Sequence, residues 1–345
     1  MKRLDLILLV LAVLLCGAFV LGGSAQAASG VIELKLSTHK PPVAATVKAF
    51  EEWAQKVEKE TGGKVKISVY TASSLVKMPD IIPATQRGIC DIGDIVLHTE
   101  RDKYPLTTIL NLPFLDLGNP QTCLKIWNEL EDKYPGMKKE RDRFKVLYKQ
   151  TSSAGHVNTT DKQVRLPEDV KGMKIIAQGH VARVLKSMGA SPLAVEVPEW
   201  YSSLDRKLAE GILLHYYGVY ETKIYEHLPY HTTIGNGFAL LSEELIMSWN
   251  TWNKLPPDVQ KVFDNLNPWL TQRVWEKIDQ STKKGVEVMK QAGQEFYICT
   301  PEEVQKWYEA ALPFHKELIK QLTAKGLPAD KVYEDALNLA KKYNQ

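Results

Sequence analysis

Strand-like and helix-like segments alternate along this chain, and few architectures accommodate that order. Residues 31–38 alternate apolar and polar side chains, as a half-buried strand does, and residues 64–70 repeat the pattern. Between them, apolar residues recur at helical spacing over 43–57, and Gly62-Gly63 supplies a stop. A strand, a helix and a strand in this order require parallel pairing through a right-handed crossover. The chain is therefore predicted to be an α/β protein.

The same rhythm continues towards the C-terminus. Further strands are expected at 90–96, 144–149, 173–177, 193–197, 212–216 and 295–299, and further helices at 79–87, 120–130, 181–188, 199–208, 255–292 and 300–324. The last helix follows a capping box with proline in its first turn, Thr300-Pro301-Glu302-Glu303. The series restarts after Pro167, and two α/β lobes in sequence account for that restart.

The N-terminus has the three parts of a secretory signal. Residues 1–3 are basic, residues 6–21 are apolar, and Ala25-Gln26-Ala27 matches a cleavage site, so the mature chain is expected to begin near Ala28 in the periplasm. An uncleaved membrane anchor is the alternative, and the cleavage site argues against it. Cys16 follows a leucine where a small residue is expected, so a lipid anchor is not predicted.

The composition argues against several classes of protein. The net charge is +3 with Lys and Glu interspersed, so the chain has no electrostatic footprint for nucleic acid. No segment after the signal is apolar and long enough to cross a bilayer, and the mature chain is expected to be soluble. Cys90, Cys123 and Cys299 are an odd number at wide spacing, which favours buried thiols over a disulfide framework but leaves one bridge open.

No constellation of residues indicates catalysis. His227 and His231 are four apart, but Pro229 lies between them, so they cannot share a helix face as a metal pair would. Ser152-Ser153 stands in a plausible loop but lacks the glycines of a nucleophile elbow. No catalytic residue, metal site or cofactor is therefore assigned, and the protein is not expected to be an enzyme.

The second lobe carries a dense cluster of aromatic and polar residues near the end of the strand expected at 212–216. Its members are Glu199, Trp200, Tyr201, His215, Tyr216, Tyr217 and Tyr220. Ligands of open α/β sheets bind at such strand ends. Because side chains alternate along a strand, Tyr216 is not expected to point the same way as His215 and Tyr217.

With these residues in place, the sequence resembles the periplasmic receptors of tripartite ATP-independent periplasmic (TRAP-type) transporters. The matching segments occur in the family's order: 34–42 (LKLSTHKPP), 88–92 (GICDI), 112–115 (LPFL), 166–175 (LPEDVKGMKI), 188–190 (MGA), 197–201 (VPEWY) and 255–259 (LPPDV). The resemblance implies two α/β lobes that are joined by crossing strands and a long spanning helix, and that close on ligand by a hinge. It also implies small organic acids as ligands, and integral membrane permease subunits driven by an ion gradient as partners.

On this resemblance the chain divides into a signal peptide and two lobes. The expected parts are a signal peptide at 1–27, a first lobe at 28–152 plus about 243–300, a second lobe at 153–242, a long spanning helix at 250–292 and C-terminal helices at 301–345.

One departure from the family pattern concerns the ligand. The family has Lys-Ile-Arg, whose arginine clamps a ligand carboxylate, where this chain has Lys174-Ile175-Ile176. The polar residue that many relatives carry on a later strand falls here at Leu213 or Leu214. Either another cation substitutes, with His156, His180 and Arg183 as candidates, or the ligand is not a simple carboxylate. The Tyr cluster favours an aromatic or bulky ligand, and a cation held by Glu199 and the Tyr faces is the next possibility.

The sequence therefore predicts an exported receptor that binds a small organic molecule and delivers it to a TRAP-type permease. The binding protein of an ATP-driven transporter, a sensor subunit and a periplasmic enzyme remain as alternatives. The residues expected to contact ligand are His39, Met78, Ser153, His156, Ile176, Gln178, Glu199, Tyr201, His215, Tyr216, Tyr217 and Phe238.

Overall fold

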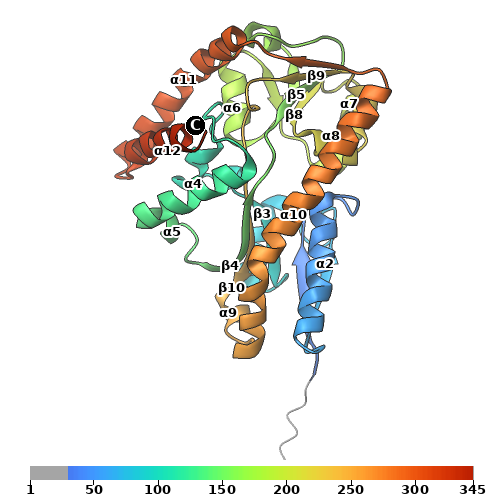
Figure 1. The fold of residues 1–345 in the computed structure, drawn as a ribbon, viewed down its shortest axis with the longest axis vertical. Helices are drawn as coiled ribbons and strands as arrows, with labels where there is room; N and C mark the ends of the chain where they lie inside the picture. The colour runs from blue at the N-terminus through green and yellow to red at the C-terminus, as the bar shows by residue number, and fades with distance from the viewer. Residues whose placement is uncertain (1–29, 345) are drawn as a thin grey trace, which may run out of the picture.

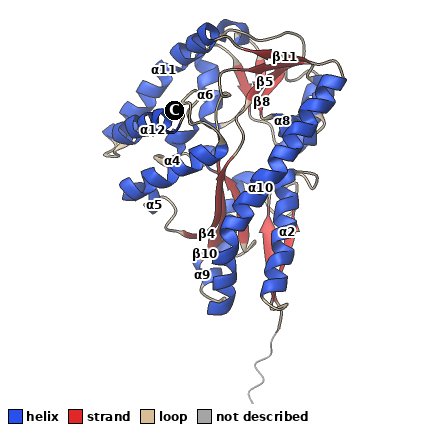
Figure 2. Cartoon of the chain, viewed as in Figure 1, coloured by secondary structure: helices blue, strands red, loops and turns tan. Residues whose placement is uncertain are grey.

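The computed structural model describes residues 30–344, which form two β-sheets with helices packed around them (Figures 1 and 2). The signal peptide expected at 1–27 lies outside these residues. The first sheet has the order β2-β1-β3-β10-β4 and the second has the order β11-β9-β5-β8-β6-β7. The two-lobed α/β architecture predicted from the sequence is confirmed.

In the first sheet, β1, β2 and β3 are parallel, while β10 is antiparallel to both β3 and β4. The strands are β1 (Ile32–Ser37), β2 (Val65–Tyr70), β3 (Ile92–Val96), β4 (Phe144–Thr151) and β10 (Ser242–Ser248). Helix α2 (Ala45–Glu60) connects β1 to β2, as the alternation predicted, and it buries Phe50, Trp53 and Val57 against this sheet.

The second sheet is mixed. Its strands are β5 (His156–Thr159), β6 (Lys174–Ile176), β7 (Ser191–Leu193), β8 (Gly211–Leu214), β9 (Tyr230–Thr233) and β11 (Glu295–Ile298). Strands β6, β7 and β8 are parallel, and β5 is antiparallel to β8 and β9. Strand β11 pairs with β9, so the placement of 295–298 in the first lobe was wrong. The physical reason is that the preceding helix delivers the chain to the far end of the molecule, where β9 offers a free edge.

Two segments, 152–155 and 234–241, carry the chain between the sheets, and the second begins with a turn at 234–237. They are joined by backbone hydrogen bonds from Ser152 N to Leu241 O (2.8 Å), from Gly155 N to Ala239 O (3.0 Å) and from Phe238 N to Gly155 O (2.7 Å). The crossing strands implied by the family resemblance are therefore present, and they are coupled to one another.

Helix α10 (Pro257–Gln291) is the third connection between the lobes. It runs beside α2 and then reaches α8 (Tyr216–Glu221) of the second lobe (Figure 1). Leu266 and Val274 belong to the hydrophobic core of the first lobe, and Met289 to a core of the second. The helix continues through Pro268.

The remaining helices cover the outer faces of the two sheets and the seam between them. They are α3 (Ile81–Arg87), α4 (Pro120–Lys133), α5 (Pro135–Lys139), α6 (Gly179–Ser187), α7 (Trp200–Asp205), α9 (Trp249–Trp252), α11 (Pro301–Ala324) and α12 (Ala329–Tyr343), with 3₁₀ turns η1 (Met78–Asp80), η2 (Leu97–Thr99), η3 (Thr107–Asn111), η4 (Pro167–Val170), η5 (Val197–Glu199) and η6 (Ile224–His227). The capping box predicted before α11 is present, with Thr300 Oγ1 accepting from Glu303 N.

The structure differs from the predicted elements around the aromatic cluster. The strand expected to reach residue 216 ends at Leu214, and His215 instead caps α8, so Tyr216 and Tyr217 lie on a helix. The strand expected at 193–197 is instead β7 at 191–193, and residues 197–199 form the 3₁₀ turn η5, which contains Pro198.

Within residues 30–344, no helix is both long and apolar enough to cross a membrane, and no cluster of three or more His, Cys, Asp or Glu side chains is arranged to hold a metal ion. Cys90, Cys123 and Cys299 are free and buried, as their spacing predicted.

Gly285 sets the approach of α10 to the second lobe. A Cβ at this position would lie 2.7 Å from Tyr220 Cβ and 3.0 Å from Tyr220 Cγ, so α8 packs directly on the glycine. Replacing glycine by alanine inside a helix normally stabilises it, by about 0.5–1 kcal/mol. Here we expect Gly285→Ala to destabilise the protein by about 1–3 kcal/mol, because the contact is overpacked.

Urea denaturation monitored by circular dichroism measures this change. Lys284→Ala, at the adjacent exposed position, is the control and should leave stability nearly unchanged. A stabilised Gly285→Ala variant would contradict the proposed close contact between α8 and α10.

Candidate ligand-binding site

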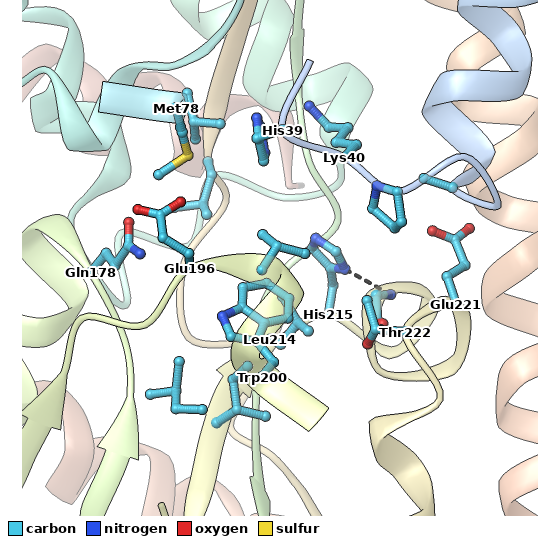
Figure 3. A pocket seen from close by; sticks show the side chains of 18 of the residues that line it. His39, Lys40, Met78, Gln178, Glu196, Trp200, Leu214, His215, Glu221 and Thr222 are labelled. Carbon is cyan, nitrogen blue, oxygen red and sulfur yellow. Dashed lines mark hydrogen bonds between the residues drawn. The ribbon is translucent and has the colours of Figure 1, made fainter. Parts of the chain in front are cut away.

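A cavity of about 150 Å³ lies between the two lobes, and side chains from both lobes line it (Figure 3). The first lobe contributes the loop after β1, η1, η2 and the start of β10, while the second contributes the ends of β6 and β8, the turn before α7, and α8. Its position outside the carboxyl ends of parallel strands is the one at which open α/β sheets bind ligands.

The first-lobe wall contains a buried ion cluster centred on Lys40. The Lys40 Nζ donates to Asp94 Oδ2 at 2.7 Å and lies 3.3 Å from Glu243 Oε2. Asp94 Oδ2 also accepts from Thr38 Oγ1 at 2.6 Å, and Glu243 Oε2 from Gln150 Nε2 at 2.7 Å. The ammonium is therefore held by protein carboxylates before any ligand arrives.

The cluster's electrostatics keep Lys40 charged. Burial alone would lower the pKa of Lys40, but the charges of Asp94 and Glu243 outweigh it and raise the pKa above its usual value. Burial opposes ionisation of Asp94, yet the charge of Lys40 holds the pKa of that carboxyl below its usual range. For Glu243 burial prevails and raises the pKa of the carboxyl. Lys40 and Asp94 thus form an ion pair, with Glu243 as a weaker acid beside it.

Three histidines line the cavity in their neutral form. Burial lowers the pKa of His39 to about 3, that of His98 to about 4 and that of His215 to about 3. At neutral pH these imidazoles therefore offer hydrogen-bonding nitrogens but no positive charge.

The orientation of His215 follows from its place at the start of α8. Its Nδ1 accepts from Gly218 N at 3.0 Å (Figure 3). Its ring stacks on Tyr217 with centroids 3.5 Å apart. Since Nδ1 accepts, the proton of the neutral ring lies on Nε2. Any Cβ at residue 218 would lie 2.6 Å from His215 Cε1, so glycine is needed there for this ring position.

The second-lobe wall is largely apolar. Ile176 and Leu214 end adjacent strands, and the indole of Trp200 is held by a hydrogen bond from Nε1 to Val195 O at 2.9 Å. Ile176 stands where the family resemblance predicted an arginine, and it is 2% exposed. This wall therefore offers an apolar surface in place of a carboxylate clamp.

Two further carboxylates line the cavity. Within residues 30–344, the Glu196 carboxylate has no hydrogen bond or ion pair to a protein side chain or backbone group. Glu221 Oε1 accepts from Ala45 N at 2.9 Å and from Ser281 Oγ at 2.6 Å, and burial raises the pKa of this carboxyl to about 7. Glu221 thus links the start of α2 to α10 at the edge of the cavity.

Half of the residues expected from the sequence to contact ligand line this cavity. Those that do are His39, Met78, Ile176, Gln178, His215 and Tyr217. Those that lie outside it are Ser153, His156, Glu199, Tyr201, Tyr216 and Phe238.

The six residues outside have identifiable surroundings. His156 stacks on Tyr216 with centroids 3.9 Å apart, behind the sheet end. Tyr201 is 40% exposed and donates to Glu226, and Glu199, two residues before it, is exposed as well. Phe238 is fully buried among aromatic rings of the second-lobe core. Ser153 lies in the crossing segment 152–155, where its carbonyl accepts from Ser152 Oγ.

The cations proposed as substitutes for the missing arginine also lie elsewhere. His180 Nε2 faces Thr108 Oγ1 at 3.4 Å, and the guanidinium of Arg183 lies 5.0 Å from the ring centroid of Phe314. The lysine at the cavity is Lys40, which was not among the residues expected from the sequence to contact ligand.

The sequence also missed His98, Glu196, Glu221 and Glu243. Glu243 and His98 follow from no local pattern, because the fold brings them to the cavity from distant segments. Trp200 belongs to the aromatic cluster seen in the sequence but was not among the expected contacts. Trp200 is four residues after Glu196, where the chain enters a helix. This helical spacing was the sequence signal that both side chains could lie on one side.

Comparisons with known proteins agree with this architecture. Residues 36–322 match the family model described as bacterial extracellular solute-binding protein, family 7. The C4-dicarboxylate-binding protein DctB of Bacillus subtilis (strain 168) is 24% identical over 294 residues, covering 79% of this chain and 81% of its own length. The C4-dicarboxylate-binding periplasmic protein DctP of Rhodobacter capsulatus is 23% identical over 325 residues, covering 89% and 92%.

Solved structures of TRAP solute-binding proteins have the same fold as this chain. An open complex of a TRAP periplasmic solute-binding protein from Desulfovibrio salexigens DSM2638 is 27% identical with a TM-score of 0.76, covering 91% of this chain and 97% of that one. A TRAP solute-binding protein from Rhodoferax ferrireducens T118, in complex with copurified benzoate, is 21% identical with a TM-score of 0.83, covering 91% and 99%.

The raised pKa of Glu221 predicts a pH-dependent effect of its replacement. The folded protein holds the Glu221 proton up to about pH 7, against an ordinary pKa of 4.5, so this carboxyl destabilises the fold as pH rises through that window. Glutamine keeps the acceptor oxygen but cannot ionise. We therefore expect Glu221→Gln to gain stability relative to wild type by about 1–2 kcal/mol more at pH 8 than at pH 5.

Urea denaturation of both proteins at the two pH values gives the comparison, with pH 5 as the internal control. An equal difference at both values would show that Glu221 does not ionise within this window.

Proposed function

The chain belongs to family 7 of the bacterial extracellular solute-binding proteins, and from this membership we propose that it is the periplasmic receptor of a TRAP-type transporter. In this role it captures a small organic molecule between its lobes and delivers it to integral membrane permease subunits driven by an ion gradient. It acts as a receptor and not as an enzyme. The observation that carries the proposal is a cavity between the lobes to which both contribute side chains.

Lobe closure supplies the mechanism of capture. A ligand that contacts His39 and Lys40 on one wall and Ile176 and Trp200 on the other stabilises the closed form over the open form. The crossing segments 152–155 and 234–241 are the places where a rotation of one lobe against the other can be absorbed. The affinity then depends on contacts that exist only after closure.

The cavity sets limits on the ligand. A cavity of about 150 Å³ matches the size that holds a single benzene ring in an engineered protein core. A dicarboxylate would bring two negative charges to a site where Glu196, Glu221 and Glu243 already stand and where Lys40 is already paired. The site therefore favours a compact ligand that is not a dicarboxylate. The solved relative from Rhodoferax ferrireducens T118 has benzoate, a single-ring molecule, in its complex.

Native mass spectrometry of the purified mature protein tests this proposal. We expect wild type to carry, or to gain from a metabolite extract, one small molecule that denaturation releases unchanged. His215→Ala should lose that molecule because the imidazole faces the cavity. Tyr201→Ala removes an exposed aromatic ring outside the cavity and should retain it.

Two outcomes would contradict the proposal. A protein that neither carries nor gains a small molecule is not a solute receptor. A bound molecule that is converted to a product during incubation would instead restore the enzyme alternative.

A further inference from the structure

The charged groups around the cavity are predominantly acidic, and this bears on the ligand of the proposed receptor. The lining includes the cation Lys40 and the carboxylates Glu196, Glu221 and Glu243. Asp94 lies directly behind Lys40, with Oδ2 2.7 Å from the ammonium. Lys40 therefore brings no free positive charge into the cavity.

The acidic balance does not depend on how the weaker acids titrate. Burial raises the pKa of Glu221 to about 7 and also raises the pKa of Glu243, so both carboxyls are weaker acids than an exposed glutamate. With both protonated, the carboxylates Asp94 and Glu196 still outnumber the one cation, Lys40. With both ionised, the excess of negative charge is larger. Either state repels an anion and attracts a cation.

The histidines do not reverse this balance. His39 and His98 are each 8% exposed, and burial lowers the pKa of both well below neutrality. Their Nδ1 atoms have no hydrogen-bond partner among the residues that the structure describes, although both rings line the cavity. Buried nitrogens without partners are costly, so this wall is built for a ligand that carries a hydrogen-bonding group.

Among the carboxylates that line the cavity, Glu196 is the one that remains available to pair with a ligand. Glu243 accepts from Gln150 and faces Lys40, and Glu221 accepts from the backbone of Ala45, whereas the Glu196 carboxylate has no such partner within residues 30–344. Glu196 and Trp200 lie on the same wall, four residues apart (Figure 3). A carboxylate beside an indole face is a favourable setting for an organic cation.

We propose, on the basis of the receptor function above, that the ligand is a compact organic cation whose nitrogen contacts Glu196 and whose apolar part lies against Trp200, Leu214 and Ile176. The nitrogen's charge offsets the acidic excess, and the apolar wall accommodates a body of about one ring. Ile176 then fits this ligand, because an arginine at that position would repel it.

Three one-ring probes of similar size separate the possible charge classes. They are benzylamine, a cation at neutral pH, benzyl alcohol, which is neutral, and benzoate, an anion. Each is titrated calorimetrically into the dialysed mature protein at pH 7, into Glu196→Gln and into Glu199→Gln. Glu199 is the matched control, because it is an exposed glutamate three residues away and outside the cavity.

We expect wild type to bind benzylamine at least about tenfold more tightly than benzoate. Glu196→Gln should weaken benzylamine about tenfold and benzyl alcohol less than about threefold, since only the cation loses a charge partner. Glu199→Gln should bind all three probes as wild type does.

Benzoate binding as tight as that of benzylamine would overturn the proposal, and so would a Glu196→Gln variant that binds benzylamine normally. If no probe binds, the test is the identity of the molecule that denaturation releases from the purified protein. An organic cation supports the proposal, and a carboxylate overturns it. A carboxylate leaves the receptor function standing, whereas the absence of any bound molecule contradicts the receptor function as well.

Discussion

The charge of the ligand cavity depends on the pairing of Lys40 with Asp94 and Glu243. Lys40 follows β1, Asp94 lies in β3 and Glu243 in β10, so one buried cluster ties three neighbouring strands of the first sheet together. Removing one member would leave an uncompensated buried charge, which is strongly destabilising. The ion pairs that stabilise this side of the cavity also neutralise the Lys40 ammonium. An anionic ligand would therefore find no unpaired positive charge there.

The cluster lies where the chain crosses between lobes. Glu243 lies two residues after the crossing segment 234–241, which is hydrogen-bonded to the other crossing segment, 152–155. On the opposite side, α10 passes from the core of the first lobe to that of the second. The ligand cavity is therefore framed by the three connections between the lobes, and movement of one lobe against the other changes its walls directly.

The sequence predicted the fold better than the site, for physical reasons. Strand and helix periodicity is local, so the β-α-β order and the capping box before α11 were visible in short windows. Lys40 was not expected at the site, because its partners Asp94 and Glu243 are remote in sequence. Glu199 was expected at the ligand and Glu196 was not, because a sequence pattern does not show which side of the 3₁₀ turn at Val197–Glu199 meets the cavity.

A crystal structure of the mature protein with the molecule that copurifies with it tests the cation-binding cleft most directly. The account predicts a ligand nitrogen within about 3.2 Å of a Glu196 carboxylate oxygen, with the pair between Lys40 and Asp94 intact. A ligand carboxylate bound to Lys40, with Asp94 displaced from the ammonium, would contradict it.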